Sequence, residues 1–571
     1  MKVPCSRWLW LLLSVALIPI SCRQEEPVPA PGLELERFPA QVTTYNLGET
    51  TILQDQFPEE SPFRHMPVRL EGVIGVPESD SQHPVVLIMH GKHIECPVEF
   101  EWPCSAEEEH KNYEGFTYLV EALAKAGYVA LAINVNAEHT LGFGEGPPTV
   151  RTQQLIDLHL GELAAANAVE SDAFGLDLSG RADMTQMVWL GHSRGGDIAN
   201  WIIRDQKLDR SAREIGYGPV QGLIHVAAPA AFIDSLPAVD LPTALILPAC
   251  DWDVLALTGQ QFYESARFDP DRVNFLSSIY LEHANHNYFN STLPADPLLD
   301  DRPDCEANVL LDPQAQQDFL VQYTIDFLQT LYAEPDLAQA AYQRLGILPS
   351  EPAPDELYGA LAKTTLAPAK PDTRPLIRPE SEQELSVNLL GGDVQLTGIQ
   401  ATFCPEGYYV PESAPGTEPC KRVNLNQPGN PQQLAVQWED SGAEFRTSMP
   451  KTAVDWSQYA ALQLRVALDP LSELNVEGQP LSFTVELVDG RDRSSHVTVS
   501  DVEYPPGVRL PNDHFEGDSF SGHVTMPTLR IPLEEFEGID LANITEIALL
   551  FDQTQAGALF IADLEMVKGD S

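Results

Sequence analysis

The sequence predicts an α/β region followed by an all-β sandwich, and two patterns of hydrophobicity lead to that fold class. From residue 41 to 332, strand-like and helix-like segments alternate, as in a mostly parallel sheet with helices on both faces. Beyond residue 384, apolar residues recur at every second position, as in the run Phe483-Thr484-Val485-Glu486-Leu487. The chain has 571 residues, more than one hydrophobic core normally serves, so we expect at least two domains.

The elements follow in order from these periodicities. In the first region, near-continuous apolar runs predict buried strands at 68–76, 83–89, 128–135, 187–190, 222–228, 243–247 and 277–281. Helical spacing of apolar residues predicts helices at 116–126, 151–168, 197–203 and 314–332. Period-two segments predict sandwich strands at 462–468, 483–487, 497–499, 529–532, 547–551 and 559–566. Between the two regions, the proline density of 333–384 favours an extended linker, which leaves 385–571 as the β-sandwich domain.

The N-terminus has the layout of a cleaved export signal. Lys2 and Arg7 precede an apolar stretch, Trp8 to Ile20, which is too short to span a membrane, so residues 1–21 are expected to be a signal peptide. Cys22 follows Ser21 and opens a polar tether, 22–40, which resembles a bacterial lipoprotein signal with a lipidated cysteine. The alternative is ordinary signal cleavage. The sequence thus predicts an extracytoplasmic protein, either lipid-anchored at the cell envelope or secreted.

Charge and cysteine content are consistent with that predicted location. Acidic residues outnumber basic ones 84 to 34, and the formal net charge of -50 argues against nucleic acid or an anionic membrane surface as a partner. Without Cys5 and Cys22, six cysteines remain for pairing in an oxidising compartment. Proximity in sequence favours the pairs Cys96–Cys104 and Cys404–Cys420. Cys250 and Cys305 are then left to pair with each other.

The motif with the most chemical content is Gly191-His192-Ser193-Arg194-Gly195. It stands directly between the predicted strand 187–190 and the predicted helix 197–203. A serine on such a sharp strand-to-helix turn is held out of the backbone toward a base, and the flanking glycines allow strand and helix to approach closely. Ser193 is therefore the candidate nucleophile of a serine hydrolase.

A serine nucleophile requires a base and an orienting carboxylate, which come from later strand ends in the order Ser, acid, His. Asp251 directly follows the predicted strand 243–247 and is the candidate acid, with Asp253 as the alternative. His286 follows the last predicted strand and is the candidate base, with His283 as the alternative. An imidazole with an ordinary pKa near 6.5 can take the serine proton and return it to a leaving group at neutral pH.

Acyl transfer also requires N–H donors for the developing oxyanion. The backbone N–H of Arg194, directly after the nucleophile, is the first candidate. The loop His90-Gly91-Lys92 follows the predicted strand 83–89, and the backbone N–H of Lys92 is the second. No metal ligands or cofactor are expected in this region.

These motifs resemble those of the α/β-hydrolase superfamily over roughly residues 40–332, and look most like its chlorophyllase, acetylhydrolase and polyester-hydrolase branch. The resemblance implies the α/β-hydrolase fold and the triad roles given above. The β-region resembles the jelly-roll modules of secreted carbohydrate-active enzymes, on Asp455-Trp456 and Ile561-Ala562-Asp563. That resemblance implies contact with a glycan or matrix, and some such modules hold a structural Ca²⁺. Aromatic residues of this region are candidates for stacking on sugars: Trp438, Trp456, Tyr408, Tyr409 and Tyr504.

The sequence therefore favours a carboxylic ester hydrolase that works through an acyl-enzyme on a small or polymeric ester. One alternative is a polysaccharide-directed acyl esterase or a peptidase. The other alternative, from a different class, is a surface binding protein with a relict triad. Because every candidate catalytic residue precedes the predicted linker, the sequence also predicts that residues 385–571 are dispensable for turnover of small esters.

Overall fold

The computed structural model describes residues 38–569 apart from 99–100, 141–142, 144–147, 205–212, 231–237, 255–256, 295–304, 406–431, 470–471, 476–481 and 501–525. The expected signal peptide, Cys22 and most of the expected tether lie outside the described residues, as do Cys420, Tyr408, Tyr409 and Tyr504.

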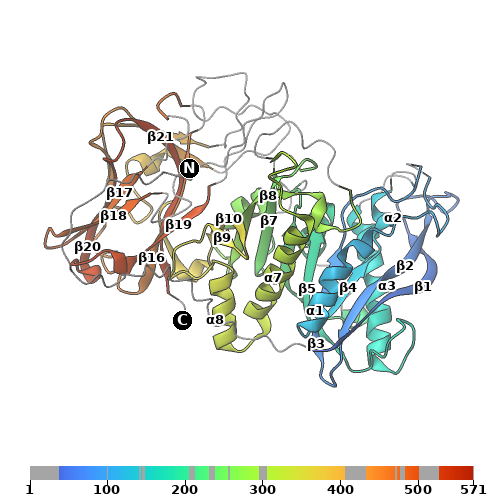
Figure 1. Ribbon diagram of the computed structural model, residues 1–571. Helices are drawn as coiled ribbons and strands as arrows, with labels where there is room; N and C mark the ends of the chain where they lie inside the picture. Colours follow the sequence, from blue (N-terminus) through green and yellow to red (C-terminus); the bar gives the residue numbers. More distant parts are fainter. Residues whose placement is uncertain are drawn as a thin grey trace, which may run out of the picture. The chain divides into compact units, whose positions relative to one another are not determined.

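A ten-stranded mixed sheet forms the centre of the N-terminal part (Figure 1), in the order β1-β2-β4-β3-β5-β6-β7-β8-β10-β9. The middle strands, from β4 to β8, pair in parallel. At one edge β1 and β2 are antiparallel, and at the other β10 and β9 are antiparallel. The strands are β1 (Ala40–Leu53), β2 (His65–Pro77), β3 (His83–Met89), β4 (Val129–Ile133), β5 (Ala182–His192), β6 (Val220–Val226), β7 (Thr243–Cys250), β8 (Leu276–Asn285), β9 (Glu356–Leu357) and β10 (Ala360–Ala367).

Helices cover both faces of this sheet. Leu155 and Leu160 of α3 (Pro148–Ala168) and Ile198 of α4 (Arg194–Arg204) join one apolar core. On the other face, a second core contains apolar residues of α1 (Thr117–Lys125) and α7 (Pro313–Tyr332). The start of α7 follows from its sequence, because the Asp312 side chain accepts a hydrogen bond from the Gln314 N–H and Pro313 occupies the first turn. Helix α2 (Asn136–His139) directly follows β4, and α6 (Gln260–Arg267) follows β7.

The predicted fold class is wrong. Strand residues make up 37% of the structure and helical residues 24%, so the protein is largely β, with large mixed and antiparallel sheets in place of the mostly parallel sheet of an α/β-hydrolase. The sequence-based prediction failed at the sheet edges. Strand β1 alternates between partly buried and exposed residues and was not identified, and β9 and β10 fall in the segment that was predicted as a linker.

The proline-rich segment 333–384 is not an extended linker. It contains α8 (Pro335–Arg344), whose Pro335 lies in the first helical turn, where the missing N–H costs no hydrogen bond. Strand β10 then pairs with β8 of the ten-stranded sheet. Five residues later, β11 (Thr373–Ile377) pairs with β21 (Gly557–Lys568) of the sandwich. Proline density predicted the absence of structure, whereas Pro335 begins a helix, Pro368 directly follows β10 and Pro375 lies within β11.

The C-terminal part is a sandwich of two antiparallel sheets. A six-stranded sheet has the order β13-β14-β21-β16-β19 with β11 also on β21, and a five-stranded sheet has the order β12-β15-β20-β17-β18. A shared apolar core lies between them. Its remaining strands are β12 (Val394–Thr397), β13 (Ile399–Cys404), β14 (Gln433–Trp438), β15 (Ala443–Ser448), β16 (Tyr459–Leu468), β17 (Phe483–Asp489), β18 (Ser494–Val499), β19 (Thr528–Pro532) and β20 (Ile544–Phe551).

Two of the aromatic residues considered as sugar platforms belong to this core. Trp438 is 1% exposed and stacks on Phe551 with 4.2 Å between ring centroids. Trp456 is fully buried. Neither indole is available at the surface for a ligand, so their role here is packing.

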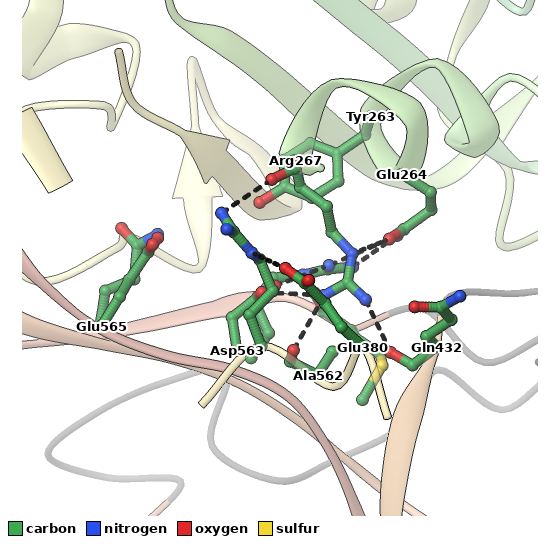
Figure 2. Close-up of polar contacts among 12 residues, drawn as sticks. Tyr263, Glu264, Arg267, Glu380, Gln432, Ala562, Asp563 and Glu565 are labelled. Atoms are coloured by element: carbon green, nitrogen blue, oxygen red, sulfur yellow. Dashed lines mark hydrogen bonds and ion pairs between the residues drawn. The ribbon is translucent and has the colours of Figure 1, made fainter. Parts of the chain in front are cut away.

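Buried ion pairs join α6 to the sandwich (Figure 2). The guanidinium of Arg267 contacts the Asp563 carboxylate at 2.8 Å and donates to the Ala562 carbonyl at 2.8 Å. Arg465 of β16 contacts Glu264 of α6 at 2.7 Å and Asp563 at 3.1 Å. All four charged side chains are at most 10% exposed, so each charge depends on its partners for compensation. We call Glu264, Arg267, Arg465 and Asp563 the junction cluster.

Two disulfides confirm the expected pairs Cys96–Cys104 and Cys250–Cys305. Cys404 is also disulfide-bonded, and Cys420, its expected partner, lies outside the described residues. Disulfides indicate an extracellular or otherwise oxidising environment. Among the described residues, no helix is long and apolar enough to cross a membrane.

Candidate functional site

Ser193 lies in the turn between β5 and α4, with a backbone φ of +53°. Few residues other than glycine adopt this region, so the turn is held by its surroundings. The Ser193 N–H donates to the Val226 carbonyl at 2.7 Å, which ties the turn to the end of β6. The serine is 4% exposed.

The flanking glycines permit close approach at this turn. A Cβ on Gly191 would lie 2.3 Å from the Gly196 nitrogen, and a Cβ on Gly195 would lie 2.8 Å from the His90 carbonyl oxygen. Both distances are shorter than real Cβ contacts, so neither position accepts a side chain without movement of the backbone.

The loop after β3 lies directly against the serine. A Cβ on Gly91 would lie 2.4 Å from the Ser193 Cβ and 2.9 Å from its Oγ. The next residue is Lys92, whose side chain is exposed. This arrangement brings the Lys92 backbone to the same corner as Arg194, as required of two oxyanion donors.

His90 fixes that loop. Its Nε2 accepts the Val135 N–H at 3.0 Å, so Nδ1 carries the proton and donates to the Gly91 carbonyl at 2.8 Å. Burial lowers the pKa of His90 to about 4. The ring therefore stays neutral near pH 7 and serves as a brace between the ends of β3 and β4.

Asp251 directly follows β7 and is buried. Its Oδ1 accepts the N–H groups of Asp253 at 2.9 Å and Val254 at 2.6 Å. Its Oδ2 lies 2.9 Å from Nδ1 of His286. With one oxygen held by two backbone donors, the carboxylate presents the other to the imidazole in a fixed orientation.

His286 follows β8 and is fully buried. Its ring lies 4.9 Å from the ring of His192, centroid to centroid, and its carbonyl lies 3.0 Å from Nε2 of His192. His192 directly precedes Ser193, so the structure brings the candidate base to the same turn as the candidate nucleophile. This convergence is expected of parallel strands, because β3, β5, β7 and β8 all end at one edge of the sheet.

The two alternatives have different positions. The Asp253 carboxylate lies 3.3 Å from Nε2 of His286, on the opposite side of the ring from Asp251. Its side chain is 59% exposed. His283 has a φ of +61°, and its carbonyl accepts the Leu311 N–H at 2.9 Å. The geometry thus favours Asp251 and His286 for the acid and the base.

Two titratable groups next to the turn escaped the sequence-based prediction. Burial, followed by the neighbouring His286, holds the pKa of His192 well below its ordinary value, so this ring is neutral. Glu138 of α2 is buried with Oε1 3.9 Å from Nε of Arg194, and burial raises its pKa to about 8. Glu138 lies five residues beyond the end of the buried strand β4, and a carboxylate soon after such a strand was the available signal, since β4 ends at the same edge as β3.

The Cys250–Cys305 disulfide adjoins the acid. Cys250 is the last residue of β7, so the bridge anchors the chain directly before Asp251. The Cys96–Cys104 bridge lies in the segment 93–112, between β3 and α1. There, the ring of His93 lies 5.4 Å from that of His192, centroid to centroid. Among the described residues, no group of three or more His, Cys, Asp or Glu is placed to hold a metal ion.

No protein-family model matches the sequence, and no curated protein matches it. Among solved structures, the chain is similar to a family 11 carbohydrate-binding module from Clostridium thermocellum in complex with a beta-1,3-1,4-mixed-linked tetrasaccharide. The match has 11% identity and a TM-score of 0.20, and it covers 35% of this chain and 96% of that chain. A likeness this low carries no argument about fold or ligand.

Proposed function

We propose that the protein is a serine hydrolase that cleaves carboxylic esters through an acyl-enzyme intermediate. The observation that carries the proposal is the contact of Nδ1 of His286 with Asp251 at 2.9 Å, beside a serine held at positive φ. A buried carboxylate–imidazole pair at a strained serine turn is the arrangement that activates a hydroxyl.

In this mechanism, Ser193 Oγ attacks the ester carbonyl and His286 Nε2 takes its proton. The carbonyl oxygen becomes an oxyanion, which the backbone N–H groups of Arg194 and Lys92 receive. His286 then returns the proton to the departing alcohol, and an acyl-Ser193 remains. Water, deprotonated by His286, attacks the acyl carbon, the Ser193 C–O bond breaks, and the serine recovers its proton. Asp251 holds the imidazole tautomer that has its proton on Nδ1 and stabilises the imidazolium.

The choice of an ester over a peptide rests on the resemblance of the motif around Ser193 to the chlorophyllase, acetylhydrolase and polyester-hydrolase branch. Contact of the sandwich with a glycan or matrix, and a lipid anchor at Cys22, remain parts of the proposal that rest on sequence resemblance. A structural Ca²⁺ in the sandwich rests on the same resemblance.

The test combines turnover with covalent capture. The wild-type protein is expected to hydrolyse short p-nitrophenyl esters and to react with a fluorophosphonate probe at Ser193. Ser193→Ala is expected to lose both, by about 10⁴-fold or more in turnover. Ser179→Ala, in the turn before β5, is the matched control and should match the wild type. Probe attached elsewhere, or turnover retained by Ser193→Ala, would refute the proposal.

A further inference from the structure

The imidazole of His286 lies between two carboxylates of one loop, hydrogen-bonded to the first and within ion-pair distance of the second. Asp251 lies 2.9 Å from Nδ1, and Asp253 lies 3.3 Å from Nε2. Ester hydrolysis as proposed above accounts for the first contact. It does not account for the second, because Nε2 is the atom that has to receive the Ser193 proton.

The two carboxylates are not equivalent. Asp251 is buried, and its second oxygen is fixed by the N–H groups of Asp253 and Val254. Asp253 contributes its own N–H to that arrangement, which fixes its backbone beside the ring, whereas its side chain is 59% exposed. The exposed Asp253 carboxylate can leave the imidazole and become hydrated by a change of rotamer. The buried Asp251 carboxylate, held by two N–H donors, cannot do so.

The charge at Nε2 has a definite chemical effect. A carboxylate at 3.3 Å stabilises a proton on Nε2, and Asp251 already stabilises one on Nδ1. Together they favour the imidazolium, which has no lone pair with which to accept a proton from serine. The other titratable ring that faces His286 is His192 of β5, which burial keeps neutral. The two aspartates thus place a negative charge at each nitrogen of the ring.

We propose that Asp253 is a positioning residue that holds Nε2 of His286 in the resting enzyme and must release it before Ser193 can be deprotonated. The inference rests on the proposed ester hydrolysis, which it extends with a control on the base. Occupation of the site by substrate, or a pH high enough to remove the Nε2 proton, would displace the carboxylate toward solvent. Asp253 therefore sets the lower pH limit of activity.

The sign follows from the charge. A carboxylate that stabilises the imidazolium moves the acidic limb of the kcat/KM profile to higher pH, so Asp253→Asn should move it to lower pH. For a partly exposed carboxylate we expect about one pH unit, which corresponds to up to about tenfold higher kcat/KM on the acidic side of the limb. Salt screens the exposed Asp253 charge as well as the field of the whole chain, whose net charge is -50, so the wild-type limb should move further to lower pH between roughly 0.05 and 1 M NaCl than the Asp253→Asn limb.

The experiment measures kcat/KM against pH at low and high salt for the full chain, Asp253→Asn and a matched control. Glu121→Gln removes the same charge from the exposed face of α1, where Glu121 pairs with Lys125, and should give the wild-type profile. Thermal melting establishes that each variant is folded. An Asp253→Asn limb that coincides with the wild-type limb overturns the inference. So does loss of activity at every pH in a folded Asp253→Asn, since Asp253 would then be the orienting acid.

A second readout separates this inference from the proposed function. In protein labelled with ¹⁵N-histidine, His286 can be assigned by its loss in His286→Gln and titrated by NMR without any substrate. A lower His286 pKa in Asp253→Asn than in the wild type supports the contact even if no ester is hydrolysed. An unchanged pKa overturns the contact even if the protein is an esterase.

Discussion

Asp251 and Asp253 are two residues apart, yet the loop after β7 gives them opposite environments. The turn that places both N–H donors on Asp251 also turns the Asp253 side chain outward, so one carboxylate is a fixed internal charge and the other a solvated one. The sequence could name both as candidates because both follow a strand. Only the hydrogen bonds of the turn decide which carboxylate faces Nδ1, and a motif does not encode them.

His286 and His283 provide a residue-scale prediction. His286→Ala is expected to lower kcat by about 10⁴-fold or more, because it removes the imidazole whose Nδ1 contacts Asp251. His283→Ala is the matched control, and it should retain kcat within a few-fold. The measurement is p-nitrophenyl ester turnover, with near-UV circular dichroism as the check on folding. Inactive His283→Ala beside active His286→Ala would reverse the assignment.

At the scale of elements, the contact between the β3 loop and the serine turn leads to a second prediction. Gly91→Ala places a Cβ 2.4 Å from the Ser193 Cβ, so the loop or the turn has to move. We expect kcat to fall by about 10²-fold, since a small displacement of an oxyanion donor is sufficient for that loss, with KM little changed. Gly442→Ala, where nothing lies within 4 Å of the added Cβ and the backbone φ is not positive, is a control for the general cost of replacing glycine. Wild-type kcat in Gly91→Ala would place the loop outside the mechanism.

The Cys250–Cys305 disulfide gives a third prediction. Replacing both cysteines with serine should lower the free energy of unfolding by about 2 to 4 kcal/mol, because the bridge closes a loop with a sequence separation of 55. It should also lower activity, since the bridge anchors the chain before Asp251. The Cys96–Cys104 bridge closes a loop with a sequence separation of only 8. Replacing these two cysteines with serine should therefore lower the free energy of unfolding by less than replacing Cys250 and Cys305. Urea unfolding monitored by fluorescence measures both, and an equal loss would contradict the loop argument.

Element prediction from the sequence succeeded for continuous apolar runs and for long segments with helical spacing, and failed where polar side chains interrupt a strand. The run 83–89 coincides with β3, and the predicted helix 314–332 is α7 apart from Pro313. Such elements can be identified from the sequence because both faces of a central strand, or one face of a helix, are apolar. Strands β1 and β10 belong to sheet edges, where polar side chains interrupt the pattern and the partner strand decides the structure. The fold class was consequently mistaken.

For the molecule as a whole, the junction cluster and the pairing of β10 with β8 argue that the sandwich cannot be removed without loss. A protein cut after residue 332 would lack β10 and expose the N–H and C=O groups of β8. We expect it to be insoluble or inactive toward small esters. A protein cut after residue 368 keeps β10 and should be soluble, but less stable than the full chain. Soluble yield and p-nitrophenyl ester turnover measure this, and a fully active, stable 38–332 fragment would contradict it.

The order in which the chain becomes available has a consequence for when the sandwich can form. Strand β21 lies at the C-terminal end, yet it pairs with β11, β14 and β16 in the interior of the six-stranded sheet. Until residues 557–568 have been synthesised, three strands lack their common partner. Folding of this half is therefore dominated by long-range contacts, which makes it slow and exposes unpaired strands meanwhile. A nick that separates residues 557–568 from the rest of the sandwich should therefore prevent the whole six-stranded sheet from forming.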